Sequence, residues 1–295
     1  MFKIFQKIID LFKKSNNKEE QVQLPSEYKP ELCFWIDRSW KDIENLEKYI
    51  KICSELRVSR VGLFVNGIDH NPFNKPANPF FPFTSQEKLI NAVKKFGEKG
   101  IKCDLTCWIW PHPQYIEKMV AYVKPVLEIP GTRLDLDSES AWATKYADNG
   151  KRVDCAKLLY SLIPPEKISI NDYASLQDCT RLLFKEGVRL RPQAYSVGYV
   201  VRNGQKVYTT SSSYYWPGTT QRNAMSERMW GKYLKTHQID IGLACYKPIN
   251  GLSKLEQIKI QVEVAKKYNS KEIWFWQLNG IDSEYKEAFK KVFPK

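Results

Sequence analysis

Eight short apolar runs alternate with longer amphipathic segments along this chain of 295 residues. The apolar runs have the length of strands and occupy residues 33–37, 60–66, 101–110, 132–137, 168–172, 188–195, 239–246 and 272–278. Apolar residues recur at helical spacing in residues 40–55, 85–99, 113–126, 140–162 (with a break near 149–150), 174–186, 221–236, 252–268 and 282–292. Such alternation predicts a parallel sheet, because crossover helices join parallel strands. Eight units predict a single closed (β/α)8 TIM barrel.

An open, doubly wound sheet is the alternative for such a chain. That fold places a glycine-rich phosphate-binding turn after its first strand. Here the first strand is followed by Asp37-Arg38-Ser39-Trp40, which contains no glycine. We therefore expect residues 29–295 to form the barrel as one domain.

Residues 1–28 are expected to precede the barrel as a helix and a linker. In residues 1–14, apolar side chains recur at helical spacing with lysines opposite them, which predicts a basic amphipathic helix. Polar residues interrupt its apolar run, so we expect synthesis in the cytoplasm without a signal peptide. Three roles fit this helix: contact with an anionic membrane or wall surface, docking on a partner, or covering the bottom of the barrel. The polar stretch 15–23 predicts the linker.

The chain is strongly basic, with 46 lysine and arginine residues against 33 acidic ones and a formal net charge of +13. Such an excess favours nucleic acid, an anionic membrane or an acidic cell-wall polymer, and a lysine-rich genome composition produces it too. Nucleic-acid binding requires basic and aromatic residues interleaved on one surface. The lysines are instead scattered along most helical segments, so we expect no nucleic-acid partner.

Seven cysteines are dispersed along the chain. Their odd number argues against a disulfide framework and for a reducing compartment. Cys103 and Cys107 form a C-x3-C pair, but none of the three histidines is placed to complete a convincing zinc set. We expect buried free thiols, no metal and no cofactor.

Polar and aromatic residues collect where the predicted strands end, which in a TIM barrel is the active-site face. The candidate site residues are Asp37, Trp108, Trp110, Asp135, Asp137, Glu139, Asn171, Gln193, Tyr195, Tyr246, Trp276 and Gln277. Aromatic faces bind sugar rings, and amides and carboxylates bind hydroxyl groups. The set therefore favours a carbohydrate cleft, although each tryptophan could equally pack under a loop.

The fourth strand carries the sharpest signal, because leucines and acids alternate in Leu134-Asp135-Leu136-Asp137-Ser138-Glu139. Side chains two apart on a strand share a face, so all three acids should point into the barrel or its mouth. Carboxylates about 6.6 Å apart repel one another, and at least one should keep its proton near neutral pH. A protonated acid beside an ionised one suits glycoside cleavage. A divalent-cation site and a helix N-cap at Ser138 or Ser140 are the alternatives.

A long insertion follows the sixth strand. Residues 197–210 predict a hairpin that turns at Asn203-Gly204, and residues 211–220 an aromatic, hydroxyl-rich loop. Long loops on this face of a barrel are usually functional, and the alternative is that the loop only shields a barrel edge.

The strand-four sequence resembles the D-x-D-x-E signature of chitinase-type family 18 glycoside hydrolases, with Arg133 in place of the glycine that usually precedes it. Its last half, Asp137-x-Glu139, equally resembles the D-x-E of family 25 lysozymes, the muramidases of many phage endolysins. On the lysozyme side, Trp35-Ile36-Asp37 resembles the first-strand aspartate motif, and Trp276-Gln277 resembles a W-Q-Y motif with Leu278 in place of the tyrosine. On the chitinase side, Tyr195 matches the sixth-strand tyrosine.

Both families cleave β-1,4 bonds to sugars that bear a 2-acetamido group, and the resemblance implies substrate-assisted catalysis. Glu139 would then protonate the leaving oxygen, and Asp137 would orient the acetamide and stabilise it as it becomes an oxazolinium-like cation. Asp135 would share the proton or hold Asp137, and Asp37 would assist from the first strand. Tyr195 would hydrogen-bond the acetamide oxygen.

Peptidoglycan and chitin both fit this chemistry. Peptidoglycan is anionic, so the net charge favours it through electrostatic steering. The sequence therefore predicts a monomeric muramidase-like peptidoglycan hydrolase of the endolysin type, which acts on the cell wall after phage-mediated release or as part of a virion. A chitinase-type hexosaminidase is the first alternative, and a catalytically silent carbohydrate-binding barrel is the second.

Overall fold

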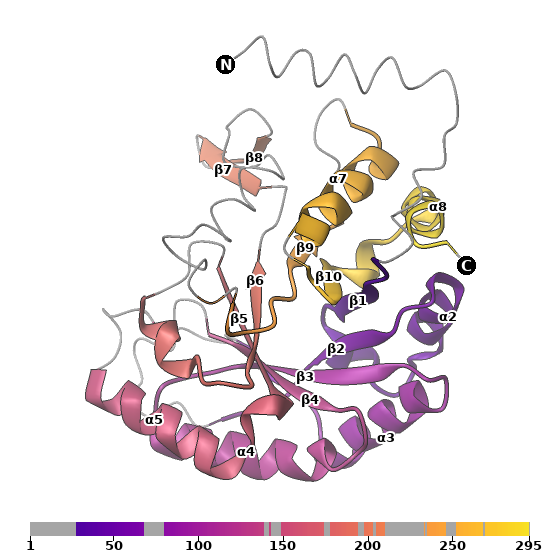
Figure 1. Ribbon diagram of the computed structural model, residues 1–295. Helices are drawn as coiled ribbons and strands as arrows, with labels where there is room; N and C mark the ends of the chain where they lie inside the picture. Colours follow the sequence, from indigo (N-terminus) through magenta and orange to yellow (C-terminus); the bar gives the residue numbers. More distant parts are fainter. Residues whose placement is uncertain are drawn as a thin grey trace, which may run out of the picture.

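The computed structural model describes residues 28–67, 80–138, 142, 149–173, 178–193, 198–202, 205–209, 233, 235–245, 252–267 and 269–294. Within this part, eight parallel strands close into a barrel in the order β1-β10-β9-β6-β5-β4-β3-β2 (Figure 1). Their bounds are β1 Glu31–Ile36, β2 Arg60–Phe64, β3 Lys102–Trp108, β4 Arg133–Asp137, β5 Ile168–Tyr173, β6 Arg189–Gln193, β9 Gly242–Ala244 and β10 Glu272–Trp276. The prediction of a single closed barrel is confirmed.

Helices pack around the outside of the strands (Figure 1). Their bounds are α2 Glu47–Leu56, α3 Gln86–Gly97, α4 Pro113–Leu127, α5 Asn149–Leu162, α7 Lys254–Lys267 and α8 Ser283–Val292. Two begin at side-chain N-caps, because Ser85 accepts a hydrogen bond from the amide of Lys88 and Asp282 one from the amide of Tyr285. The outward residues of the strands and the inner faces of the helices share one apolar core.

Two of the predicted helices differ from the structure. Residues 40–55 form a short 3-10 helix, η2 (Ser39–Asp42), and then α2. The carboxylate of Asp42 accepts hydrogen bonds from Lys48 and Tyr49 of α2, and this contact joins the two pieces. Within 174–186, the described part forms the 3-10 helix η7 (Asp178–Leu183) in place of an α-helix. A further 3-10 turn, η6 (Pro165–Lys167), precedes β5.

The insertion after β6 contains the predicted hairpin. Strands β7 (Gly198–Arg202) and β8 (Gln205–Thr209) pair in antiparallel fashion, with Arg202 opposite Gln205. The predicted N-terminal helix (1–14), the linker (15–23), the aromatic loop (211–220) and most of the helix 221–236 lie outside the described residues.

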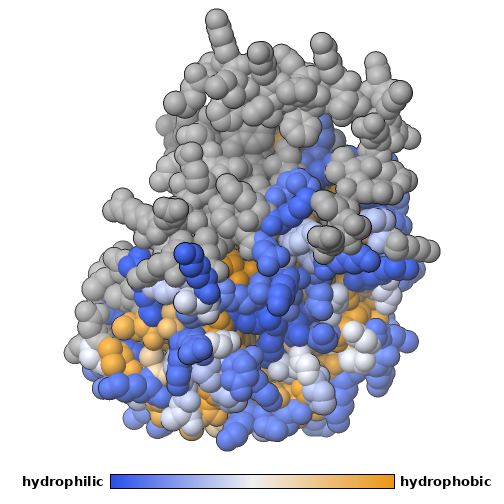
Figure 2. Space-filling model, viewed as in Figure 1, coloured by the Kyte–Doolittle hydropathy of each residue, from blue (hydrophilic) through white to orange (hydrophobic). Residues whose placement is uncertain are grey.

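The described surface is mainly hydrophilic. Hydrophobic residues appear as separate patches among hydrophilic ones on the face shown in Figure 2. None of the described helices has both the length and the apolar character needed to cross a bilayer.

Six cysteines are buried free thiols, namely Cys33, Cys53, Cys103, Cys107, Cys155 and Cys245. Burial raises the pKa of each of these thiols, to about 12 for Cys155 and higher for the others. Among the described residues, no three histidine, cysteine or acidic side chains lie together as metal ligands would.

The side chain of Trp35 lies across the inside of the barrel. It packs on Trp274, with ring centroids 5.0 Å apart, and reaches the backbones of two other strands. A Cβ atom on Gly62 of β2 would lie 2.5 Å from Trp35 Cδ1, and one on Gly242 of β9 would lie 2.9 Å from Cη2. Both positions therefore require glycine, because the rigid indole occupies the space of a side chain.

We predict that Gly62→Ala destabilises the protein by about 1–3 kcal/mol, because the added methyl group forces Trp35 or the strand to move. Gly97→Ala is the matched control, since an added Cβ there meets nothing within 4 Å at the end of α3. The control should be as stable as the wild type or up to about 1 kcal/mol more stable. Urea unfolding measures both changes, and equal stability of Gly62→Ala and wild type would contradict the close contact.

Candidate active site

Strand β4 has the predicted alternation. Leu134 and Leu136 are buried in the core shared with the helices, whereas Asp135 lies inside the barrel. The carboxylate of Asp135 accepts hydrogen bonds from Trp35 Nε1 (3.1 Å) and Ser169 Oγ (2.9 Å). The prediction that these leucines and this acid face opposite sides of the wall is therefore confirmed.

Arg191 of β6 holds Asp135 from below. Its Nη1 atom lies 2.6 Å from Asp135 Oδ1, and its guanidinium carbon lies 3.7 Å from the ring centroid of Trp274. Both Arg191 and Asp135 are fully buried. Asp135 thus links the barrel wall to a charged layer beneath the mouth, and its predicted hold on Asp137 stays a prediction.

That charged layer fills the amino-terminal end of the barrel. Arg133 donates to both Asp104 (2.9 Å) and Glu272 (2.7 Å), and Arg191 Nη2 lies 3.0 Å from Asp104 Oδ2. Arg60 pairs with Asp104, while Arg189 pairs with Asp240 and Glu272. We call this set the basal charge layer, and its members are Arg60, Arg133, Arg189, Arg191, Asp104, Asp135, Asp240 and Glu272.

The arginines shift the pKa values of these acids. Burial alone would raise the pKa of Asp104, but Arg133, Arg60 and Arg191 together hold it far below its ordinary value. Arg133 likewise lowers the pKa of Glu272 to about 2 against the effect of burial. Burial and then the charge of Glu272 raise the pKa of Asp240. Asp104 and Glu272 are therefore ionised at neutral pH.

Asp137 lies at the mouth, at the last position of β4. Gln193 Nε2 of β6 donates a hydrogen bond to Asp137 Oδ1 at 3.2 Å. Trp108 and Asn171 are the partners of Asp137 in the registers of β3 and β5. The structure thus brings four of the predicted site residues to one level of the barrel.

Several polar atoms of predicted site residues are buried without a hydrogen-bond partner in the described part of the chain. They are Trp108 Nε1, Asn171 Oδ1 and Gln277 Oε1, and Asn66 Oδ1 beyond the end of β2 adds a fourth. Buried polar atoms normally find a partner in protein or water. These atoms can therefore serve a polar ligand or bound water.

The aromatic candidates differ in how much they are covered. Trp108 and Trp110 are buried and stack on each other, with ring centroids 5.7 Å apart. Trp276 is only partly buried and meets Phe64 edge-on, with centroids 5.5 Å apart. The peptide bond between Trp276 and Gln277 is cis. Trp276 therefore offers more ring surface at the mouth than the β3 pair does.

Asp37 follows β1 and is partly exposed. Its carboxylate lies 3.8 Å from Arg38 Nε, and its carbonyl oxygen accepts a hydrogen bond from Asn279 Nδ2 at 2.8 Å. Because Trp35 pairs with Trp276 in register, Asp37 emerges beside the end of β10. It therefore lies on the same side of the barrel as Asp137, as predicted for residues after strand ends.

Three candidates, Glu139, Tyr195 and Tyr246, lie outside the described residues. The backbone before Glu139 is described, and Ser138 N donates to Asn171 O at 3.0 Å. Strand-like pairing with β5 thus continues one residue past Asp137. The roles predicted for these three residues stay predictions.

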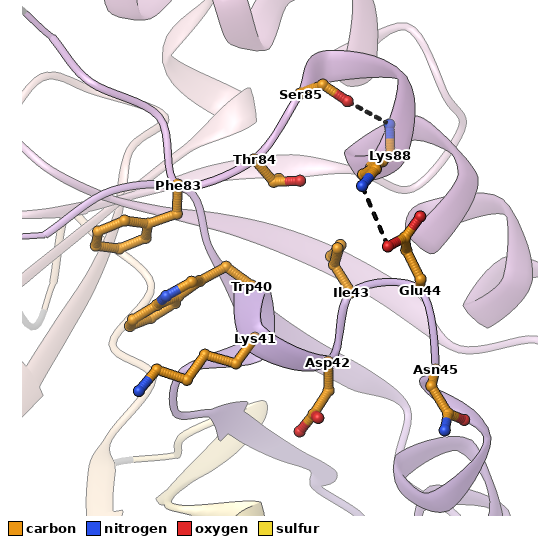
Figure 3. Close-up of a pocket in the computed structure, with 10 residues that line it drawn as sticks. All are labelled: Trp40, Lys41, Asp42, Ile43, Glu44, Asn45, Phe83, Thr84, Ser85 and Lys88. Atoms are coloured by element: carbon orange, nitrogen blue, oxygen red, sulfur yellow. Dashed lines mark hydrogen bonds and ion pairs between the residues drawn. The ribbon is translucent and has the colours of Figure 1, made fainter.

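A pocket of about 360 Å³ beside the mouth was not expected from the sequence. Its first side is formed by η2 and the turn that follows, and its second side by the start of α3. Trp40 and Phe83 stack at one end of it (Figure 3). The sequence signals available for it are Trp40, soon after β1, and Phe83, shortly before α3. The helical pattern of residues 40–55 instead predicts Trp40 at the start of one continuous helix, whereas it lies in η2.

No known protein-family model matches the sequence, and no curated protein sequence matches it. Solved structures with similar folds include the catalytic domain of a hyperthermophilic chitinase from Pyrococcus furiosus (14% identity, 90% of this chain and 95% of that chain, TM-score 0.55). The Bacillus cereus spore cortex-lytic enzyme SleL is also similar (10% identity, 92% of this chain and 76% of that chain, TM-score 0.55). A xylanase and α-amylase inhibitor protein from Scadoxus multiflorus is similar as well (14% identity, 90% of this chain and 98% of that chain, TM-score 0.54). At such low identity the likeness shows the TIM-barrel fold, and this fold is shared by enzymes and an inhibitor protein.

We predict that Glu272→Gln destabilises the protein by about 3–5 kcal/mol at pH 7, because it leaves Arg133 and Arg189 without part of their charge partner. The pKa of Glu272 is lowered in the folded state, so its stabilisation is present above its ordinary value of 4.5 and is lost as pH falls to about 2. The difference in unfolding free energy between wild type and variant should therefore become smaller as the pH falls from 4.5 to about 2. Urea unfolding at several pH values measures it.

The control for this experiment is Glu117→Gln, which removes an exposed carboxylate on α4. Its stability should stay within about 0.5 kcal/mol of the wild type. If the loss of unfolding free energy caused by Glu272→Gln stays constant from pH 7 to pH 2, the charge of Glu272 does not contribute to stability.

Proposed function

We propose that this protein is a glycoside hydrolase that cleaves β-1,4 bonds between N-acetylated amino sugars in peptidoglycan. The observation that carries the proposal is the placement of the β4 acids: Asp135 is anchored inside the barrel, and Asp137 stands at the mouth beside Gln193 and Asn171. An acid held among amide groups and a partly exposed tryptophan suits a sugar that bears hydroxyl and acetamide groups.

Glu139 acts as the general acid in this proposal and gives its proton to the leaving glycosidic oxygen. The acetamide oxygen of the substrate attacks the anomeric carbon as the bond to the leaving oxygen breaks, which forms an oxazolinium-like ring. Asp137 orients the acetamide and offsets its positive charge. A water molecule then attacks the anomeric carbon and opens the ring, and the ionised Glu139 takes a proton from that water.

The neighbouring residues position these groups. Gln193 donates to one oxygen of Asp137 and so limits the orientation of its carboxylate. Asp135 is fixed by Arg191 and Trp35, so the strand that carries Asp137 is held from within the barrel. In the proposal, Tyr195 hydrogen-bonds the acetamide oxygen, and Asn171, Tyr246, Trp276 and Gln277 bind the sugar chain. Asp37 assists from β1.

Two observations favour peptidoglycan as the substrate in this proposal. The net charge of +13 favours an anionic polymer, and one protein of similar fold is a spore cortex-lytic enzyme. A phage-type route to the wall, and contact of residues 1–14 with an anionic surface, belong to this proposal. Chitin is the second candidate, because another protein of similar fold is a chitinase.

We predict that Glu139→Gln lowers the rate of wall hydrolysis by about 10²–10⁴-fold, because the amide cannot donate the proton of an acid. Asp137→Asn should also lose most of the rate, since it removes the charge that stabilises the cation. Loss of turbidity of purified cell walls measures the rate, and sedimentation with the walls measures binding. Glu139→Gln should keep its fold and its binding.

The exposed-carboxylate variant Glu117→Gln should hydrolyse walls as fast as the wild type. Equal activity of Glu139→Gln and wild type, or no activity in either, would remove the hydrolase proposal. Binding without hydrolysis by the wild type would favour a silent carbohydrate-binding barrel. Full activity of Asp137→Asn would overturn its acetamide role.

Mass spectrometry of the digested walls identifies the bond. New reducing ends on muramic acid indicate a muramidase, and new reducing ends on glucosamine indicate a glucosaminidase. Digestion of chitin but not of walls would favour the chitinase alternative.

A further inference from the structure

The pocket beside the mouth is built by two loops that leave neighbouring strands. One wall is η2 and the turn after it, which follow β1, and the other is the segment Thr84–Lys88 at the start of α3 (Figure 3). The volume of about 360 Å³ is large enough for one sugar ring but not for an extended polymer.

Aromatic rings connect the pocket to the mouth of the barrel. Phe64 contacts Trp276 at 5.5 Å and Trp40 at 6.5 Å between ring centroids, and Trp40 stacks on Phe83 at 3.9 Å. All four rings are partly exposed. A continuous aromatic row therefore leads from Trp276 to the pocket, and such surfaces suit the apolar faces of sugar rings.

The charges that line the pocket are balanced. Lys88 lies 3.1 Å from Glu44, and Asp42 pairs with Lys48 at 2.7 Å. With Lys41, the lining contains two basic and two acidic side chains, so its formal charges cancel. Thr84, Ser85 and Asn45 add hydroxyl and amide groups. This lining suits an uncharged ligand with many hydroxyl groups better than an anion or an apolar one.

The pocket lies too far from Asp137 for one sugar ring to occupy both. Strand β2 is two strands from β4 in the barrel wall, which is about 10 Å, and the pocket lies beyond β2. A saccharide chain that crosses the mouth along the aromatic row would place a later unit in the pocket.

We propose that this pocket is an outer subsite that binds one uncharged pyranose unit, such as N-acetylglucosamine, of the chain that is cut at the mouth. The inference rests on the proposed function, and it adds that a saccharide must be long enough to reach from the mouth to the pocket in order to bind tightly. Units in the outer subsite contribute affinity without contacting the reacting bond.

Binding of β-1,4-linked N-acetylglucosamine disaccharide and hexasaccharide, measured by calorimetry on the full chain with Glu139→Gln, tests the subsite. Trp40→Ala removes the aromatic edge of the pocket, and Asn45→Trp fills the pocket from an exposed position without altering the stacked rings. In both variants the ratio of hexasaccharide to disaccharide affinity should fall about tenfold, which corresponds to about 1.4 kcal/mol. Glu117→Gln should keep the ratio.

The outcomes separate the two proposals. If the parent chain binds the hexasaccharide more tightly and Asn45→Trp keeps the full ratio, the subsite is wrong and the proposed function stands. If the parent chain binds neither saccharide, or binds both equally well, the subsite is wrong, and the proposed function is judged by the wall-hydrolysis assay alone. Asn45→Trp decides the question even where Trp40→Ala does not fold.

Discussion

The ion pairs between arginines and carboxylates inside the barrel are the interaction on which the rest of this structure depends. Most TIM barrels fill this space with branched apolar side chains. Here Arg191 and Arg133 bridge acids from three strands, and Trp274 covers the guanidinium group of Arg191. Buried charges of this kind are tolerated only when each has a partner, so the basal charge layer ties β3, β4, β6 and β10 together across the barrel interior.

The basal charge layer also supports the candidate active site above it. Asp135 is tied to Arg191 below and to Trp35 across the barrel, so β4 is held from inside at the residue two before Asp137. Gln193 then reaches Asp137 from β6, the same strand that carries Arg191. The mouth is therefore supported by side chains from the barrel interior as well as by the backbone.

Much of the fold could be predicted from the sequence, because strand–helix alternation is a repeated local signal. Strand positions and the inward direction of Asp135 followed from apolar patterns of period two and 3.6, and the hairpin after β6 followed from the Asn203-Gly204 turn signal. The charge partners of Arg191 could not be predicted, because β3, β4, β6 and β10 meet only after the barrel closes. The split between η2 and α2 was missed because the contacts of Asp42 and Trp40 override a continuous helical pattern.

The same limit applies to the site. The acids of β4 stand out locally, so Asp137 could be placed at the mouth from its spacing alone. The support from Gln193 and the row of rings from Trp276 to Phe83 join residues far apart in the chain, and no local pattern encodes them. The burial of Trp108 and Trp110 also depends on packing around β3 rather than on their position at a strand end.

The sealed cysteines have a practical consequence. A thiol reacts with alkylating reagents and peroxides mainly as the thiolate, and burial with a raised pKa suppresses that form. While the barrel is closed, these six sulfur atoms are therefore inert, and they become reactive only when it opens. The rate at which a thiol-specific reagent labels these cysteines therefore reports how often the barrel opens, with no engineered cysteine needed.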